Sequence, residues 1–261
     1  MKRSTILMQF EIKNEGEFQY VEAGEGEIIL LLHGLFGALS NFADTINHFK
    51  DRYKVVIPIL PLYRLPLDKT SVTGMVDHVD EFIAHKGYKN LNLIGNSLGG
   101  HIGIIYTLRR QENVRTLTLT ASSGLFESSL GDQYPRKSDY EYIRKKTGET
   151  FYNPELADKE MVDEVYDIVN NREKAIRIVF LAKSAVRHNM RTEIENITVP
   201  CNLVWGKNDN ITPPFVGEEF HKLLKKSQLT FFDECCHAPM MEQPQKFNEV
   251  MDLFLAKNIP Q

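Results

Sequence analysis

Short apolar runs alternate with longer runs of helical periodicity along most of the chain. The apolar runs predict strands at residues 6–12, 18–23, 27–32, 53–58, 90–94, 114–120, 201–205 and 228–232. The longer runs predict helices at residues 41–50, 71–85, 98–111, 214–225 and 243–257. We expect the first two strands to be antiparallel edge strands and the later, more apolar ones to be parallel. The pattern therefore predicts an α/β fold with a mostly parallel sheet of about eight strands flanked by helices.

Residues 125–196 interrupt this alternation and carry no strand pattern. Helical patterns run through residues 138–147, 158–169 and 172–189. We predict a helical cap that is inserted after the sixth strand, above a core formed by residues 1–124 and 197–261, and that is not an independent domain. Its last helix carries a broad apolar stripe of Ile176, Val179, Phe180, Ala182, Ala185 and Val186. We expect this stripe to pack the cap on the core and, in part, to roof an apolar pocket.

Composition narrows the class of protein. The 261 residues are 42% hydrophobic and 25% charged, with a net charge of −4, which is typical of an ordinary globular enzyme. The chain has no basic stripe that would bind nucleic acid, and no apolar run long enough to span a bilayer. Gln9 and Glu11 interrupt the apolar run that a secretory signal would need. The expected partner is a small-molecule substrate, and the chain is expected to act as a monomer or a homodimer.

The three cysteines favour a reducing compartment. Cys235 and Cys236 are adjacent, so they do not readily form a disulfide with each other, and Cys201 leaves the count odd. Reduced thiols are typical of a cytoplasmic protein. Cysteines and histidines nowhere show metal-ligand spacing, so the sequence predicts neither a metal nor a cofactor.

The segment Gly95-Asn96-Ser97-Leu98-Gly99-Gly100 lies between a predicted strand and a predicted helix. In this context the pattern GxSxG indicates a sharp turn that exposes the serine. A serine held at positive φ crowds its neighbours, and Gly95 and Gly99 leave room for the turn. The helix that begins at Leu98 directs its first amides toward the place where a negative oxygen would form. Ser97 is therefore a candidate nucleophile beside an anion site.

A serine hydroxyl needs a base and an acid to become a good nucleophile. His237 is the candidate base, because it lies in the loop after the strand 228–232. Asp209 is the candidate acid, in the polar loop after the strand 201–205. We expect Thr212 to be the N-cap of the next helix, which leaves Asp209 available to fix the tautomer of His237. Asp233 and Glu234 are alternative acids that lie closer to His237 in sequence than the usual arrangement has them.

A fourth motif follows the strand 27–32, where the chain reads HGLFG at residues 33–37. Together the motifs resemble the α/β-hydrolase superfamily, and most of all its members with a helical cap, which include esterases, thioesterases and carbon–carbon bond hydrolases. The resemblance covers nearly the whole chain, through HGLFG at 33–37, GNSLGG at 95–100, WGKND at 205–209 and CHAPMMEQP at 236–244. It implies a catalytic triad of Ser97, Asp209 and His237, in the family's chain order.

The same resemblance assigns further roles. It implies an oxyanion hole formed by the amides of Leu98 and of Leu35 or Phe36. We expect His33 to orient this loop by hydrogen bonds. Candidate substrate-binding residues are Phe36, Asn96, Arg187 and His188.

Two departures from the family pattern concern the site. Members usually have glycine before the catalytic histidine, where this chain has Cys236. If that position has positive φ, a cysteine is strained there and the loop is reshaped. Residues 59–66 replace a loop that in many members reads Asp-x-x-Gly-x-Gly and lies near the pocket, so we expect a different pocket mouth.

The sequence thus predicts a serine hydrolase that cleaves an ester or thioester of a small apolar acyl group through an acyl-enzyme. A carbon–carbon bond hydrolase acting on a diketone is an alternative, with Arg177 or Arg187 as the residue that holds a substrate carboxylate. A cofactor-free lyase or perhydrolase and a ligand-binding protein without catalysis are further alternatives. A serine rather than an aspartate at position 97 argues against the dehalogenases and epoxide hydrolases of this family.

Overall fold

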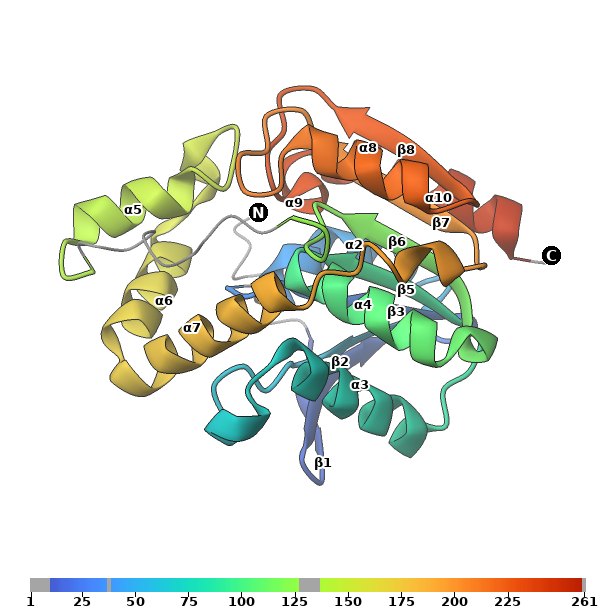
Figure 1. The fold of residues 1–261 in the computed structure, drawn as a ribbon, viewed down its shortest axis with the longest axis horizontal. Helices are drawn as coiled ribbons and strands as arrows, with labels where there is room; N and C mark the ends of the chain where they lie inside the picture. The colour runs from blue at the N-terminus through green and yellow to red at the C-terminus, as the bar shows by residue number, and fades with distance from the viewer. Residues whose placement is uncertain (1–9, 37–38, 127–136, 260–261) are drawn as a thin grey trace.

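Eight strands form one sheet in the order β1-β2-β4-β3-β5-β6-β7-β8 (Figure 1). The computed structural model describes residues 10–36, 39–126 and 137–259. The strands are β1 (Lys13–Glu15), β2 (Phe18–Ala23), β3 (Ile28–Leu32), β4 (Lys54–Pro58), β5 (Leu91–Asn96), β6 (Val114–Thr120), β7 (Cys201–Gly206) and β8 (Ser227–Phe232). β2 pairs antiparallel with β1 and β4, and all other pairs are parallel. The predicted α/β fold with a mostly parallel sheet is confirmed.

The start of the sheet differs from the prediction. Part of the strand predicted at residues 6–12 lies outside the described residues, and residues 10–12 belong to no strand. β1 begins at Lys13 instead and pairs Glu15 with Phe18 across a tight hairpin. Gly16 has φ of 59°, a left-handed conformation that glycine adopts without strain, and this turn sets where the first pair forms.

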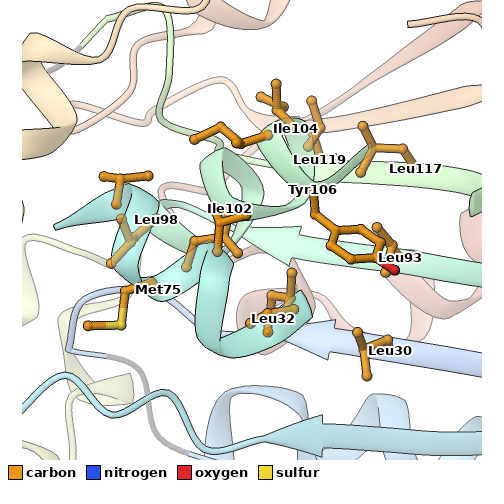
Figure 2. Packing of buried hydrophobic residues seen from close by; sticks show 14 of the residues in the cluster. Leu30, Leu32, Met75, Leu93, Leu98, Ile102, Ile104, Tyr106, Leu117 and Leu119 are labelled. Atoms are coloured by element: carbon orange, nitrogen blue, oxygen red, sulfur yellow. The ribbon is translucent and has the colours of Figure 1, made fainter. Parts of the chain in front are cut away.

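Helices cover both faces of the sheet. α3 (Val72–Lys86), α4 (Leu98–Arg109) and α8 (Pro214–Leu223) pack on one face, and α2 (Ala43–Phe49), α9 (Pro239–Glu242) and α10 (Pro244–Asn258) on the other. Alternate residues of β3 enter the two cores, since Leu30 and Leu32 belong to the first and Ile29 and Leu31 to the second. Figure 2 shows the first core, where side chains of β3, α3, α4 and β6 meet. Short 3-10 helices lie at Leu39–Phe42, Leu67–Lys69, Gln111–Asn113, Pro154–Leu156 and Ile194–Asn196.

Among the described residues between β6 and β7, three α-helices extend to one side of the sheet (Figure 1). They are α5 (Tyr140–Gly148), α6 (Lys159–Asn170) and α7 (Arg172–Arg187), and we refer to residues 140–187 as the α5–α7 segment. α5 and α6 share a small cluster of their own, built on Ile143, Val162, Val165 and Val169. α7 joins the segment to the sheet helices, because Ser184 Oγ accepts a hydrogen bond of 3.0 Å from the amide of Val72 at the start of α3.

Two of the six residues in the apolar stripe predicted on α7 are buried. Ala182 and Ala185 are buried together with Ile178 and Leu181, which form the usual i, i+3, i+4, i+7 pattern. Ile176, Val179 and Phe180 are 41–44% exposed, so the prediction is wrong for them, whereas the half-exposed Val186 lines the cavity that is described with the site. The helix is apolar on two adjacent faces, and periodicity alone did not indicate which of them faces the protein.

Candidate active site

Ser97 stands between the last residue of β5 and the first residue of α4, with φ of 54° and ψ of −121°. A Cβ atom at Gly95 would lie 2.5 Å from the carbonyl oxygen of Gly99, and one at Gly99 would lie 2.0 Å from that of Leu32. Neither glycine has positive φ, so space rather than backbone conformation requires both. Holding a serine in this backbone region costs on the order of 1–3 kcal/mol. The surrounding contacts therefore force Ser97 into the predicted strained turn.

The loop after β3 packs directly on this turn. A Cβ atom at Gly34 would lie 3.2 Å from Cβ of Ser97, which places the neighbouring Leu35 beside the serine. Leu98 is the first residue of α4, so its amide has no carbonyl partner within the helix. Leu35 and Leu98 line one cavity with Ser97. The structure thus brings together the two residues predicted to supply oxyanion-hole amides.

His33 fixes the loop that follows β3 through two hydrogen bonds of its ring. Its Nε2 accepts a hydrogen bond of 3.2 Å from the amide of Leu60, and Nδ1 therefore carries the proton that it donates to the carbonyl of Gly34 at 2.9 Å. Burial lowers the pKa of His33, which keeps the ring neutral. The predicted orienting role of His33 is confirmed.

His237 and Asp209 form a buried pair, although they come from different loops. His237 Nδ1 lies 2.9 Å from Asp209 Oδ2. Asp209 is 2% exposed, and it also accepts hydrogen bonds from the amides of Ile211 and Thr212 and from the hydroxyl of Thr212, at 2.8–3.0 Å. A carboxylate only accepts hydrogen bonds, so Nδ1 of His237 carries the proton and Nε2 is left to accept one.

The prediction that Thr212 is the N-cap of the next helix is wrong. Helix α8 begins at Pro214 with Pro213 as its N-cap, and Thr212 is not a cap. Its hydroxyl donates to Asp209 and lies 3.4 Å from Nδ1 of His237. Pro213 fits the N-cap position although it provides no side-chain cap, because its φ of −57° suits the chain that enters the helix. Thr212 is thereby available to the buried carboxylate.

The alternative acid Asp233 points elsewhere. Its side chain is 74% exposed and lies 2.7 Å from the ammonium group of Lys207. Glu234 is likewise exposed and takes the left-handed conformation in this loop, with φ of 52°. Asp209 is therefore the carboxylate that contacts His237.

Cys236 is not strained. It is absent from the residues with positive φ in the described part of the chain, and Glu234 takes that conformation two residues earlier. The thiol is buried and donates to the carbonyl of Asn208 at 3.1 Å. Burial raises the pKa of Cys236 to about 11, so the thiol is protonated at neutral pH. The strain predicted for a non-glycine residue before His237 does not occur, because the loop makes its left-handed turn earlier.

Ser97 and His237 line the same cavity, which has a volume of about 420 Å³. Its apolar wall comes from α6 and α7, through Met161, Val165, Leu181, Ala182, Ala185 and Val186. Its polar wall contains Asn41, Lys146, Glu149 and Thr150. The ammonium group of Lys146 lies 2.7 Å from the carboxylate of Glu149. The cavity is thus largely apolar on one side and carries a neutralised ion pair on the other.

Two of the four predicted substrate-binding residues reach this cavity. Phe36 and Asn96 line it, and Asn96 Nδ2 also donates to the carbonyl oxygens of Thr120 and His237, at 3.1 Å each. Arg187 is not among the residues that line the cavity, because it lies about 200° around α7 from the lining residue Ala185. His188 follows the end of α7 and is also outside the cavity. The structure therefore places Arg187 and His188, two of the predicted substrate-binding residues, outside the cavity.

The loop 59–66 does not form the pocket mouth. None of its residues lines the cavity, and Leu60 and Leu62 are buried in the first core. The residues that depart from the family pattern pack in the core instead, and the amide of Leu60 donates a hydrogen bond to His33.

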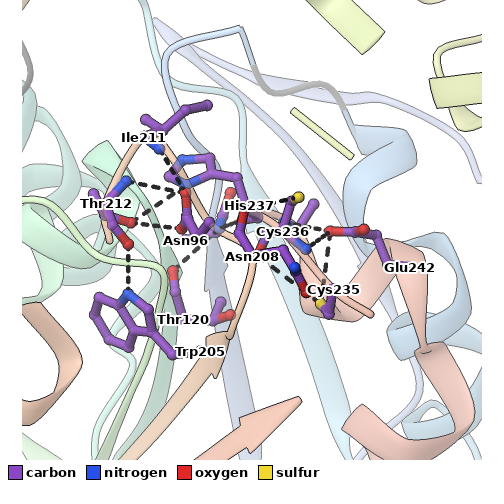
Figure 3. Close-up of polar contacts among 12 residues, drawn as sticks. Asn96, Thr120, Trp205, Asn208, Ile211, Thr212, Cys235, Cys236, His237 and Glu242 are labelled. Atoms are coloured by element: carbon purple, nitrogen blue, oxygen red, sulfur yellow. Dashed lines mark hydrogen bonds and ion pairs between the residues drawn. The ribbon is translucent and has the colours of Figure 1, made fainter. Parts of the chain in front are cut away.

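Sequence reasoning missed two residues that hold the His237 loop. The amide of His237 donates to the carbonyl of Thr150 at 3.1 Å, and the carboxylate of Glu242 accepts from the amides on either side of His237 (Figure 3). Thr150 acts through its backbone, so its residue type carries no signal. Glu242 stands five residues after His237 inside the motif CHAPMMEQP, and this spacing was the available signal.

The described residues contain no group of three or more His, Cys, Asp or Glu side chains placed to hold a metal ion. No helix among them has both the length and the apolar character to cross a bilayer.

Comparison with known proteins defines the class. The family model for the alpha/beta hydrolase fold matches residues 27–156. The crystal structure of an alpha/beta hydrolase enzyme from a metagenome of lagoon sediments (Mar Chica, Morocco) is 42% identical, covers 95% of this chain and 98% of its own, and superposes with a TM-score of 0.79. The chain therefore belongs to the α/β-hydrolase superfamily and is a hydrolytic enzyme.

Curated relatives are more distant and differ in substrate. A monoacylglycerol lipase of Xenopus laevis is 21% identical, over 97% of this chain and 84% of the relative. A 2-hydroxy-6-oxononadienedioate/2-hydroxy-6-oxononatrienedioate hydrolase of a Pseudomonas species is 24% identical, over 93% of both chains. The first cleaves an ester by its name, and the name of the second describes a dicarboxylate substrate.

Proposed function

We propose that this enzyme cleaves an ester or thioester of a small apolar acyl group, with Ser97 as nucleophile, His237 as base and Asp209 as the acid that holds the base. One observation carries the proposal: Ser97 in its strained turn and His237 on its buried carboxylate line a single cavity. The 21% identical lipase supports an ester as the bond that is cleaved.

The geometry suggests the order of steps. Ser97 Oγ attacks the carbonyl carbon of the substrate, and its proton moves to Nε2 of His237. Asp209 stabilises the resulting imidazolium through Nδ1. The amides of Leu35 and Leu98 bind the oxyanion, each contributing about 3 kcal/mol to the barrier reduction. The leaving alcohol or thiol takes the proton from Nε2. Water then attacks the acyl-enzyme, giving its proton to His237, and the acid is released with the serine restored.

The cavity walls indicate the acyl group. A volume of about 420 Å³ lies in the range of small-molecule sites. The α6 and α7 wall offers apolar contacts, and Lys146, the lysine among the described lining residues, is already paired with Glu149. An uncharged, apolar acyl chain on the α7 side fits this lining better than an acid does.

Cleavage of a carbon–carbon bond in a dicarboxylate substrate would require a cation for the substrate carboxylate. Of the two arginines considered, Arg177 donates to the carbonyls of Leu65 and Glu173, at 3.2 and 3.0 Å. Neither Arg177 nor Arg187 lines the cavity. The lining therefore favours the ester or thioester over the diketone.

We also propose that residues 125–196 act as a cap on the core, because the α5–α7 segment supplies most of the apolar lining above Ser97. A cytoplasmic location fits the three cysteines, all of which are buried and free.

Labelling with a fluorophosphonate tests the nucleophile. We expect the wild type to be labelled and Ser97→Ala to be neither labelled nor active on p-nitrophenyl esters, with the melting temperature changed by only a few degrees. Ser138→Ala, at an exposed serine of the same chain, is the matched control and should behave as the wild type. Labelling or turnover that survives in Ser97→Ala would overturn the mechanism. A series of p-nitrophenyl esters and thioesters of increasing chain length then measures the acyl preference.

A further inference from the structure

Glu242 holds the loop of His237 from both sides. It is the last residue of α9, and its Oε1 accepts hydrogen bonds from the amides of Cys236 at 2.9 Å and of Ala238 at 3.2 Å. Figure 3 shows the Glu242 carboxylate aimed at the backbone beside His237. The two amides flank the histidine, so this one oxygen determines how the backbone presents the imidazole.

The other oxygen of the same carboxylate reaches the α5–α7 segment. Glu242 Oε2 accepts a hydrogen bond of 2.7 Å from the amide of Tyr152. Two residues earlier in that segment, the carbonyl of Thr150 accepts the amide of His237 itself at 3.1 Å. Two hydrogen bonds therefore connect residues 150–152 with the loop of His237, one from the amide of His237 to Thr150 and one from the amide of Tyr152 to Glu242, whose carboxylate also accepts from the amides of Cys236 and Ala238.

A carboxylate is the side chain that this arrangement requires. The backbone amides of Tyr152, Cys236 and Ala238 all donate to this carboxylate, and the Cys235 thiol donates to Oε1 at 3.6 Å. Only an ionised carboxylate offers two oxygens that both accept. Glutamine has the same length but presents an NH₂ group at one of the two positions. That group would face either the amide of Tyr152 or the amides of Cys236 and Ala238, donor against donor. Hydrogen bonds to a charged group are stronger than those between neutral groups, so the loss of one side is costly.

We infer that Glu242 is a positioning residue that couples the α5–α7 segment to the base, and this inference rests on the proposed role of His237. Glu242 is not among the residues that line the cavity, so it acts through His237. The imidazole is aligned on Ser97 only while residues 150–152 are docked. The segment that roofs the substrate thereby also sets the position of the base.

The test compares Glu242→Gln with Glu249→Gln, a substitution of the same kind at an exposed glutamate on α10. We expect Glu242→Gln to lower kcat and the rate of fluorophosphonate labelling at least tenfold, with KM changed less than threefold. We expect amide hydrogen exchange to accelerate both in residues 150–152 and in residues 235–238. The measurements are made well below the melting temperature, so that loss of folded protein does not contribute. Glu249→Gln should match the wild type in each.

Labelling and turnover of Glu242→Gln at the wild-type rate would overturn the positioning role. Faster exchange in residues 235–238 alone would overturn the coupling to the α5–α7 segment. A wild type that is not labelled would instead contradict the proposed function, and hydrogen exchange would still decide the coupling. Should Glu242→Gln not fold, Glu242→Asp provides the same comparison, because its shorter carboxylate reaches only one of the two sides.

Discussion

The turn of Ser97 and the loop of His237 are held in place by different forces. Around Ser97 the constraint is steric, since added Cβ atoms at Gly95 and Gly99 would approach backbone atoms at 2.5 and 2.0 Å. Around His237 the constraint is a set of hydrogen bonds with Asn96 and Thr150, which are far away in sequence, and with Glu242, which follows five residues later. Close backbone contacts thus fix the turn of Ser97. The position of the His237 loop depends instead on its hydrogen-bond partners.

Because of this difference, the two halves of the site should respond to different changes in the protein. Crowding by backbone atoms does not change with substrate or with the position of the α5–α7 segment. The hydrogen bonds of the base loop include that segment through Thr150 and Tyr152. Changes in the serine turn should therefore affect folding, whereas changes around the base should affect turnover in protein that stays folded.

The largest effect is expected from Gly99→Ala. The new Cβ would lie 2.0 Å from the carbonyl oxygen of Leu32, and neither backbone can move without disturbing β3 or α4. We expect loss of activity and a loss of unfolding free energy of about 3 kcal/mol or more, which urea titration measures. The control on the same helix is Gly103→Ala, whose Cβ would meet the flexible side chains of Leu117, at 3.3 Å, and Leu32, at 3.8 Å. If both variants lose equal stability, crowding is not what holds the turn.

Asp209→Asn should be nearly as damaging to catalysis, with less effect on folding. The amide NH₂ can turn toward Nδ1 of His237 and donate to it. The proton of the neutral ring is then on Nε2, which no longer accepts one from Ser97. We expect kcat to fall by roughly 10³–10⁴. Asp233→Asn, at the exposed alternative acid, should leave kcat within threefold. A loss of only tenfold in Asp209→Asn, or a matching loss in Asp233→Asn, would move the acid to another residue.

The two halves of the site also differ in how well the sequence predicts them. The glycines around Ser97 lie within six consecutive residues, so their spacing predicts the turn. Asp209 and His237 follow predicted strands, and the carboxyl ends of parallel strands meet at one edge of the sheet. Thr150 contacts His237, and Glu242 contacts Tyr152, only when distant segments dock, and α7 is apolar on two faces. No local pattern distinguishes such contacts from surface positions, and Arg187 and His188 were misassigned for that reason.

The smallest expected effect lies on the serine side and appears only at low pH. His101 belongs to α4 and is fully buried, with its ring 5.5 Å from that of His188. Burial, with a smaller contribution from the charge of His188, lowers the pKa of His101 to about 3. In the unfolded chain the pKa of a histidine is about 6.5, so below this pH the unfolded state binds a proton that the folded state does not. Stability must therefore fall as the pH falls below about 6.5.

His101→Leu removes the group that takes up this proton, so it isolates the contribution of His101 to the loss of stability in acid. At pH 5 the wild-type histidine favours unfolding by about 2 kcal/mol, the equivalent of one and a half pKa units, and the variant should lose that much less stability between pH 7 and pH 5. His33 and His78 have pKa values that burial also lowers, so part of the acid sensitivity remains. Urea titrations at both pH values measure the difference, with His221→Gln as the control at an exposed histidine. Because His101 lies outside the cavity lining, kcat at pH 7 should stay within threefold of the wild type. An unchanged acid sensitivity would show that His101 takes up its proton in the folded state, and a large loss of kcat would show that packing around the serine turn also controls the base.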